Sequence, residues 1–140
     1  MDYRRFQDTL IVRMDKGEEI VEQLLLVAKK EDLRLASVEA LGAINDFTAG
    51  VYDTEEKKYY SNHFEGTFEI VSLTGTITRM DGEIYQHLHI SAGDDNGAVF
   101  GGHLNRAVVS ATCEMVIRVI DGEVERRKDS EIGLNLLQFL

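Results

Sequence analysis

The chain contains a single cysteine, Cys113, and neither proline nor tryptophan among its 140 residues. One cysteine excludes an internal disulfide and is typical of a protein from a reducing compartment. Apolar runs are short and interrupted, so the sequence predicts neither a signal peptide nor a membrane-spanning segment. The missing proline and tryptophan indicate no particular function. We therefore expect a cytoplasmic protein.

Basic residues are also scarce. The chain has 15 basic and 25 acidic side chains, which gives a formal net charge of −10. The basic residues form only small groups, at 4–5, 29–30 and 126–128, and we interpret each group as a solvated edge or helix end. An acidic surface repels phosphate backbones, so the composition argues against direct DNA binding.

Several motifs of catalysis and nucleotide binding are absent. There is no glycine-rich phosphate loop, no serine nucleophile elbow and no Cys-x-x-Cys pair. Gly101-Gly102 is more typical of a kink in a strand than of a nucleotide cradle. A chain of 140 residues with 44% hydrophobic side chains has the size of one domain with a real core, so we expect a single domain over 1–140.

The hydrophobic pattern predicts one helix among many strands. Apolar residues recur at helical spacing over 17–31, with Asp15 as the expected N-cap and Glu18 three residues later. Alternating or extended patterns predict strands at 6–14, 33–42, 43–52, 57–64, 67–80, 83–92, 98–104, 107–120 and 123–128, followed by an apolar piece at 134–140 that is expected to dock on the core. Asp121-Gly122 predicts a hairpin, with 123–128 as an edge strand. The fold class is therefore α+β, a mainly antiparallel twisted sheet with one principal packing helix near the N-terminus.

The most informative segment runs from 83 to 104 and holds three of the four histidines. On a strand over 83–92, alternation sends His87 and His89 to one face and Leu88 and Ile90 to the other. The fourth histidine, His63, lies in a polar run and is better explained as a surface or interface residue.

Whether His103 joins the pair depends on the turn at Asp94-Asp95-Asn96-Gly97. A type I turn followed by a left-handed glycine gives a three-residue loop that pairs His103 with His89. A two-residue loop at Asn96-Gly97 shifts the register by one and moves His103 to the opposite face. We prefer the first register because it places Phe100 and Leu104 on the apolar face.

An upstream turn at Asp81-Gly82 gives the same division of faces. It pairs Thr76 with His87 and Thr74 with His89. Three neutral imidazoles that converge in this way bind a divalent ion at about 2.0–2.1 Å per nitrogen and leave a fourth position for water or substrate. Thr74 and Thr76 are then expected to hydrogen-bond the ligands. The alternative, that the histidines are ordinary polar strand residues, stays open at this point.

Several segments together resemble a known family. These are Gly66-Thr67-Phe68-Glu69-Ile70-Val71-Ser72-Leu73-Thr74-Gly75-Thr76, His87-Leu88-His89-Ile90-Ser91, Gly101-Gly102-His103-Leu104 and Cys113-Glu114. In order and spacing they resemble the plant and prokaryote conserved (PPC) domain, of the stand-alone prokaryotic type, over nearly the whole chain. The resemblance implies a homotrimer with a mainly antiparallel sheet, and microbial relatives are often described as DNA-binding.

Two departures from the plant relatives affect what can be carried over. Thr67 stands where the plant domains have an arginine before Phe-Glu-Ile, and the chain has no basic AT-hook. Both departures argue against transferring the plant partner-recruiting and DNA-reading roles.

The histidine pattern is also similar to that of acetolactate decarboxylase and related zinc proteins. This resemblance implies zinc, or a similar divalent ion, on His87, His89 and His103, and it supplies no catalytic acid or base. Glu114 is a candidate for that group, but a buried ion-pair role is preferred.

Two functions are therefore expected. The first is a metal-binding homotrimer that acts as a regulatory or assembly module, associated with DNA through a partner. The alternative is a zinc-dependent lyase or hydrolase with a small-molecule substrate.

Overall fold

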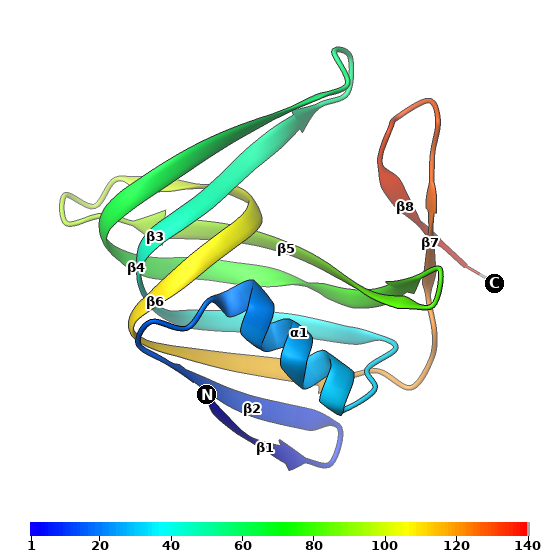
Figure 1. Ribbon diagram of the computed structural model, residues 1–140, viewed down its shortest axis with the longest axis horizontal. Coiled ribbons are helices and arrows are strands. Elements are labelled where there is room, and N and C mark those ends of the chain that lie inside the picture. Colours follow the sequence, from blue (N-terminus) through cyan, green and yellow to red (C-terminus); the bar gives the residue numbers. More distant parts are fainter. Residues whose placement is uncertain (140) are drawn as a thin grey trace.

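The computed structural model describes residues 1–139 and is mainly sheet, with one short helix (Figure 1). In chain order the elements are β1 (Asp2–Phe6), β2 (Thr9–Asp15), α1 (Ile20–Lys30), β3 (Ala36–Asp53), β4 (Lys58–Met80), β5 (Glu83–Gly93), β6 (Val99–Val119), β7 (Glu125–Lys128) and β8 (Asn135–Gln138). Helix α1 lies across one face of the sheet, near the N-terminus as expected. This architecture is consistent with the α+β class.

The strands are joined in the order β1-β2-β6-β3-β4-β7-β8, and β5 pairs with both β4 and β6. Among the described strands every pairing is antiparallel except β4 with β7, which is parallel and rests on the single register pair Arg79 and Glu125. Because β5 connects two strands that both also pair with β3, the sheet curls around the segment that carries the histidines.

Three strands are longer than the sequence predicts. The segments 33–42 and 43–52 join in β3, 57–64 and 67–80 join in β4, and 98–104 and 107–120 join in β6. Gly42 and Gly66, which mark two of the predicted boundaries, have φ near +150° and bend their strands without ending them. Register shifts between Ala40 and Gly42 in the β3–β4 pairing belong to the same bend.

Helix α1 begins later than predicted. Its N-cap is Glu19, whose carboxylate accepts a hydrogen bond from the Glu22 amide at 2.8 Å, and not Asp15. Glu18 instead reaches back to the Asp15 amide at 2.7 Å, so the capping-box contact forms in the turn before the helix. The prediction of a first strand at 6–14 was likewise too simple, because β1 and β2 form a hairpin there.

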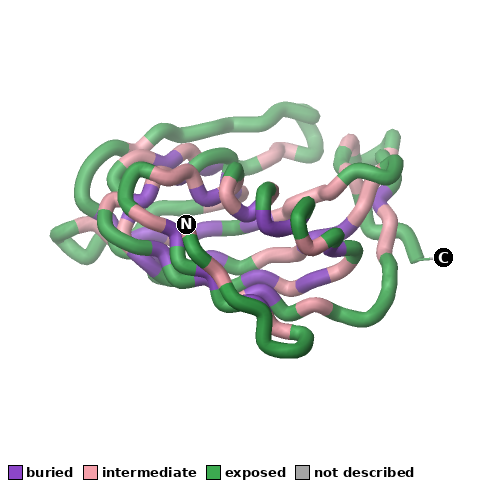
Figure 2. The backbone as a smooth tube through the Cα atoms, turned by 60° about the horizontal axis from the view of Figure 1, so that its bottom comes forward, coloured by how far each residue is buried: buried purple, intermediate pink, exposed green. Residues whose placement is uncertain are grey.

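The core lies between α1 and the sheet. Ile20, Leu24, Val27 and Ala28 of the helix are fully buried against Leu10, Met14, Ile77, Met115 and Ile117 of the strands. Figure 2 shows buried backbone concentrated in the middle of the molecule and exposed turns at its ends. Cys113 is 0% exposed, which confirms its assignment as a buried residue.

The C-terminal segment differs from the prediction. Asp121-Gly122 forms no hairpin between β6 and β7, because β7 pairs with β8 and contacts β4 instead. Leu136 and Leu137 are exposed, so this segment pairs with β7 and does not dock on the core. Leu140, the end of the predicted segment, lies outside the described residues. Helix α1 has 11 residues, and the described chain has no helix with the length and apolar character needed to cross a bilayer.

Candidate metal centre

The hairpin registers predicted from the two turns are both present. Asp81 and Gly82 have positive φ and place Thr76 opposite His87 and Thr74 opposite His89. His89 lies opposite His103 in the pairing of β5 with β6. All three histidines therefore stand on the sheet face opposite α1.

The turn at Asp94 explains why the three-residue loop forms. The Asp94 carboxylate accepts hydrogen bonds from the Asn96 and Ala98 amides, both at 2.9 Å. Gly97 has φ +80° and donates to the Asp94 carbonyl oxygen at 3.1 Å. Asp94 accepts from amides of its own turn, and Gly97 supplies the left-handed conformation. Together they fix the register that places His103 opposite His89.

The three imidazoles form a compact triangle. Ring centroids are 5.0 Å apart for His87 and His89, 5.3 Å for His87 and His103, and 5.7 Å for His89 and His103. One ring nitrogen of each lies within 4.8 Å of the others. Ligands at 2.0–2.1 Å in a tetrahedral site are about 3.3 Å apart, so small side-chain rotations close the set around one ion.

Burial and nearby positive charge lower the pKa values of His87 and His103. The pKa of His87 is lowered from its ordinary value by burial first, and then by the charges of Arg126, His103 and His89. The pKa of His103 is lowered by burial and by His89. The neutral imidazole is the form that binds a metal, and the lowered pKa values of His87 and His103 favour that form at neutral pH.

Close backbone packing holds His103 in place. Gly101 and Gly102 precede it. A Cβ at Gly101 would lie 2.0 Å from the Ile90 carbonyl oxygen, and a Cβ at Gly102 would lie 2.5 Å from the Gly50 carbonyl oxygen. The glycine pair is therefore a site of close strand approach, in agreement with the predicted kink. The Tyr59 hydroxyl, from the β3–β4 hairpin, donates to Asn105 Oδ1 at 2.6 Å and also lies 3.2 Å from the His103 carbonyl oxygen.

The two threonines lie where the register requires. Thr74 is exposed opposite His89, and Thr76 is half-buried opposite His87. Within residues 1–139 neither hydroxyl hydrogen-bonds an imidazole, and the Thr76 hydroxyl is 3.5 Å from Arg126 Nη2. Their supporting role in the metal site stays a prediction.

Arg126 is the residue that the sequence interpretation missed. It is only 8% exposed, not part of a solvated edge, and its guanidinium lies 4.6 Å from the centre of the Tyr85 ring. It donates to the Thr78 hydroxyl at 2.9 Å and to the Asn135 carbonyl oxygen at 2.8 Å. The only available signal was alternation along 125–128, which separates Arg126 from its exposed neighbour Arg127.

Glu114 lies away from the histidines. It is exposed on β6, eleven positions beyond His103, and pairs in register with Arg13 and Leu41. It forms no ion pair in the described part of the chain, so the preferred interpretation of a buried ion-pair partner is wrong.

His63 belongs to a different group, with Asp46 and Glu65. It is exposed, and one of its ring nitrogens lies 2.9 Å from Asp46 Oδ1. Arg106 contacts the same carboxylate oxygen at 2.7 Å, and together they lower the pKa of Asp46, His63 having the larger effect. A guanidinium on the shared oxygen disfavours a cation there, so this group is better explained as a surface ion-pair network.

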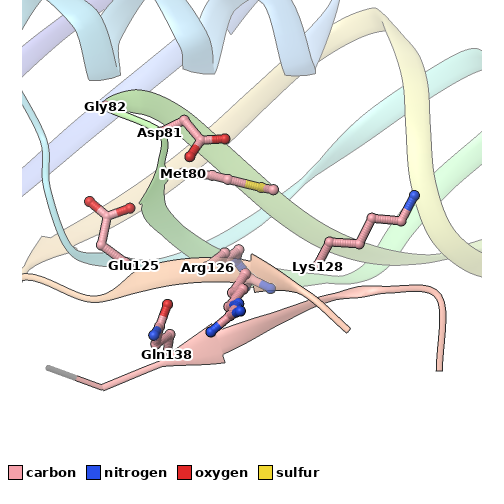
Figure 3. Close-up of a pocket in the computed structure, with 8 residues that line it drawn as sticks. Met80, Asp81, Gly82, Glu125, Arg126, Lys128 and Gln138 are labelled. Atoms are coloured by element: carbon pink, nitrogen blue, oxygen red, sulfur yellow. The ribbon is translucent and has the colours of Figure 1, made fainter. Parts of the chain in front are cut away.

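A hollow of about 710 Å³ opens next to Arg126 (Figure 3). It lies between the β4–β5 turn and the β7–β8 hairpin, and it is lined by Met80, Asp81, Gly82, Glu125, Arg126, Arg127, Lys128 and Gln138. None of the three histidines lines it. Arg126 lines this hollow and also contacts Thr76, Thr78 and Tyr85 on the polar face of the sheet.

Three nitrogen donors on a sheet, with no fourth histidine, cysteine or carboxylate in the group among residues 1–139, are the donor set of an open divalent-metal site. The fold and this face define a sheet protein with a candidate three-histidine centre. The Plants and Prokaryotes Conserved (PCC) domain, which is also abbreviated PPC, matches residues 1–121. The chain belongs to this family.

Solved structures are similar over almost the whole chain. A Bacteroides thetaiotaomicron protein described as a "putative DNA binding protein" has a TM-score of 0.96 at 29% identity, covering 99% of this chain and 96% of that one. A metal-containing protein from Archaeoglobus fulgidus has a TM-score of 0.89 at 31% identity, with 99% and 97% covered. A plant- and prokaryote-conserved protein from Pyrococcus horikoshii has a TM-score of 0.85 at 30% identity, with 99% and 94% covered.

Acetolactate decarboxylase from Bacillus subtilis subspecies spizizenii is more distant. Its TM-score is 0.57 at 15% identity, with 86% of this chain and 57% of that one covered, so the likeness shows the fold alone. Comparison with the curated proteins found no match.

Proposed function

We propose that this protein is a cytoplasmic, metal-binding homotrimer that acts as a regulatory or assembly module and associates with DNA through a partner. The observation that carries the proposal is the triangle of His87, His89 and His103, whose ring nitrogens lie within 4.8 Å of one another. Zinc is the ion that best fits three imidazole donors and an open fourth position.

Support for the metal comes from chemistry and from a relative. The pKa values of His87 and His103 are lowered, so neither imidazole needs to lose a proton before it binds at neutral pH. A relative that is 31% identical is described as metal-containing.

Support for self-association comes from the sheet face that α1 leaves uncovered. Ile11 and Leu41 on that face are 44% and 57% exposed, although both are large apolar side chains. Contact between copies would remove this surface from water. The mass in solution tests the homotrimer, and a monodisperse monomer at micromolar concentration would contradict it.

A partner is proposed for DNA because the charge opposes direct contact. Two relatives, 29% and 25% identical, are described as a "putative DNA-binding protein", whereas this chain carries a formal net charge of −10. Electrophoretic shift of the isolated protein on duplex DNA should therefore be absent at 50–200 mM salt. A shift that weakens steeply with added salt would point to direct phosphate contacts instead.

The experiment that tests the metal is elemental analysis of protein purified without a histidine tag. Wild type should hold about one zinc, or a similar divalent ion, per chain. His89→Ala should hold none, and the control His63→Ala should keep the wild-type content, because His63 lies in the separate Asp46 group. Equal metal in wild type and His89→Ala refutes the assignment.

A zinc-dependent lyase or hydrolase is the second candidate. Two specific observations favour it. The three-histidine group has no fourth protein ligand among residues 1–139, and the buried guanidinium of Arg126 is close enough to act on the pKa of His87. A bound zinc ion would supply Lewis acidity toward a substrate carbonyl or a bound water. If zinc-loaded wild type and His89→Ala hydrolyse an activated ester at equal rates, the hypothesis of a hydrolase at this centre is excluded.

A further inference from the structure

Arg126 carries a buried positive charge, and no carboxylate that the structure describes in residues 1–139 neutralises it. It is 8% exposed, and no acidic side chain within residues 1–139 forms an ion pair with it. The other strongly shielded arginine on this sheet, Arg79, does have such a partner, Asp32 at 2.8 Å. Burying an arginine without an anion is costly, so an unpaired one indicates a place for an anion that is not part of the chain.

The guanidinium also has hydrogen-bonding capacity left over. Arginine has five N–H donors, and the structure gives Arg126 three hydrogen bonds, to Thr78, Asn135 and Thr76. The contact with Thr76 is 3.5 Å long and therefore weak. If Arg126 only held the β7–β8 hairpin against β4, the bonds from Nε and Nη1 would suffice. Nη2 would then keep only its weak contact with Thr76.

The Nη2 side of the guanidinium lies next to the candidate metal centre. Nη2 is 3.5 Å from Thr76, and Thr76 is the cross-strand partner of His87. Directly paired residues have Cβ atoms about 4.5–5.5 Å apart, so only the Thr76 side chain stands between Nη2 and the residue that carries the first imidazole. The charge of Arg126 is accordingly among the causes that lower the pKa of His87. Tyr85, which lies beneath the guanidinium, is two positions before His87 and shares its face.

From this arrangement we infer that Arg126 and the three-histidine centre together bind a small carboxylate that carries a second oxygen donor near its carboxyl carbon. The carboxylate accepts from Arg126, and the second oxygen lies at the open position of the metal centre. Compounds of this class are 2-oxo acids, 2-hydroxy acids and 1,3-dicarboxylates. The inference rests on the proposed metal site and names the kind of ligand that the site takes.

Size and charge favour a small anion over a polyanion. The guanidinium, together with a divalent ion held by the three imidazoles, would make a local positive region on a chain of formal charge −10. A small carboxylate is attracted to that positive region alone, whereas a nucleic acid is also repelled by the acidic surface around it. Planar bidentate contact with a carboxylate is the geometry for which arginine is suited.

The probe is malonate, titrated calorimetrically into zinc-loaded protein, with uncharged malonamide as the matched control. Malonate should bind at least tenfold more tightly than malonamide. Arg126→Gln should lose at least tenfold in malonate affinity, Arg126→Lys should lose less because it keeps the charge, and Arg127→Gln should bind as wild type does. Zinc content and thermal unfolding of each variant show that the centre and the fold are intact.

The outcomes separate this inference from the proposed function. If wild type and Arg126→Gln hold equal zinc and bind malonate equally, the inference is overturned and the metal site stands. If malonate binding depends on Arg126 but is the same in zinc-free protein, the metal contribution is refuted and only an arginine anion site remains. Inorganic phosphate that binds more tightly than malonate overturns the assignment to carboxylates.

Discussion

His89 and His103 lie directly opposite one another in antiparallel neighbours, with ring centroids 5.7 Å apart. They are fourteen positions apart in sequence, and a single turn brings them together. A shift of one residue in that turn would move His103 to the buried face and would leave only two imidazoles on the open one. The candidate centre therefore depends on the turn chemistry of Asp94 and Gly97 as much as on the histidines.

The glycine before His103 provides the first prediction. Gly102→Ala should destabilise the protein by about 2–4 kcal/mol, because φ is +150° there and a Cβ would lie 2.5 Å from the Gly50 carbonyl oxygen. Urea denaturation measures the change. Gly93→Ala is the control, since its Cβ meets only ordinary contacts at 3.6 Å and beyond. Similar losses in the two variants would contradict the close approach of β6 to β3.

The second prediction concerns the pH dependence of metal-free protein. The pKa values of His87 and His103 are lowered below 6.5 in the fold, so the unfolded chain binds more protons as the pH falls. The free energy of unfolding should therefore decrease from about pH 7 downward, through 6.5, until the lowered pKa values are passed. A double variant, His87→Gln with His103→Gln, should show a flatter profile between pH 7 and 5. Parallel profiles for the two proteins would rule out the proposed effect.

The third prediction concerns the thiol. Burial, with a smaller contribution from Glu114, raises the pKa of Cys113 to about 12. At pH 8 a disulfide reagent should label native Cys113 only as fast as the protein unfolds, because the thiolate is scarce and covered. Labelling rates measured across a urea series test this. Fast labelling in native buffer, independent of urea, would contradict the buried position.

The fourth prediction concerns the aromatic cluster near the β3–β4 hairpin. Phe47 is 0% exposed, stacks on Phe64 at 4.8 Å and meets Phe68 edge-on at 5.1 Å. Phe47→Ala should cost about 3–5 kcal/mol in thermal or urea unfolding. Phe100 also stacks on Phe64, at 5.2 Å, but it is 39% exposed, so Phe100→Ala should cost about 1 kcal/mol. Equal losses would place Phe100 in the core as well.

The meeting of the three histidines was predictable because it depends on short-range chemistry. Asp81-Gly82 and Asp94 to Gly97 specify their turns locally, and alternation then assigns each side chain to a face. The same local logic failed at Gly42 and Gly66, where glycine bends a strand that continues through it. It also misplaced the helix start. Glu18 accepts from the Asp15 amide in the turn before the helix, whereas its neighbour Glu19 accepts from the Glu22 amide and is the N-cap.

The position of Arg126 was not predictable because it depends on a long-range contact. The register pair that docks β7 on β4 joins Arg79 to Glu125, forty-six positions apart in sequence. Nothing near Arg126 distinguishes it from Arg127 except alternation on a strand of four residues. The charged run therefore suggested an edge strand, whereas Arg126 within it packs over Tyr85.

The β7–β8 hairpin contributes Arg126 from a part of the chain beyond residues 1–121, where the family match ends. The imidazoles belong to β5 and β6, which keep their register without any help from that hairpin. Exchanging the C-terminal hairpin between relatives should therefore change which small molecules are accepted while leaving the ion in place. The two halves of the site can evolve as separate modules.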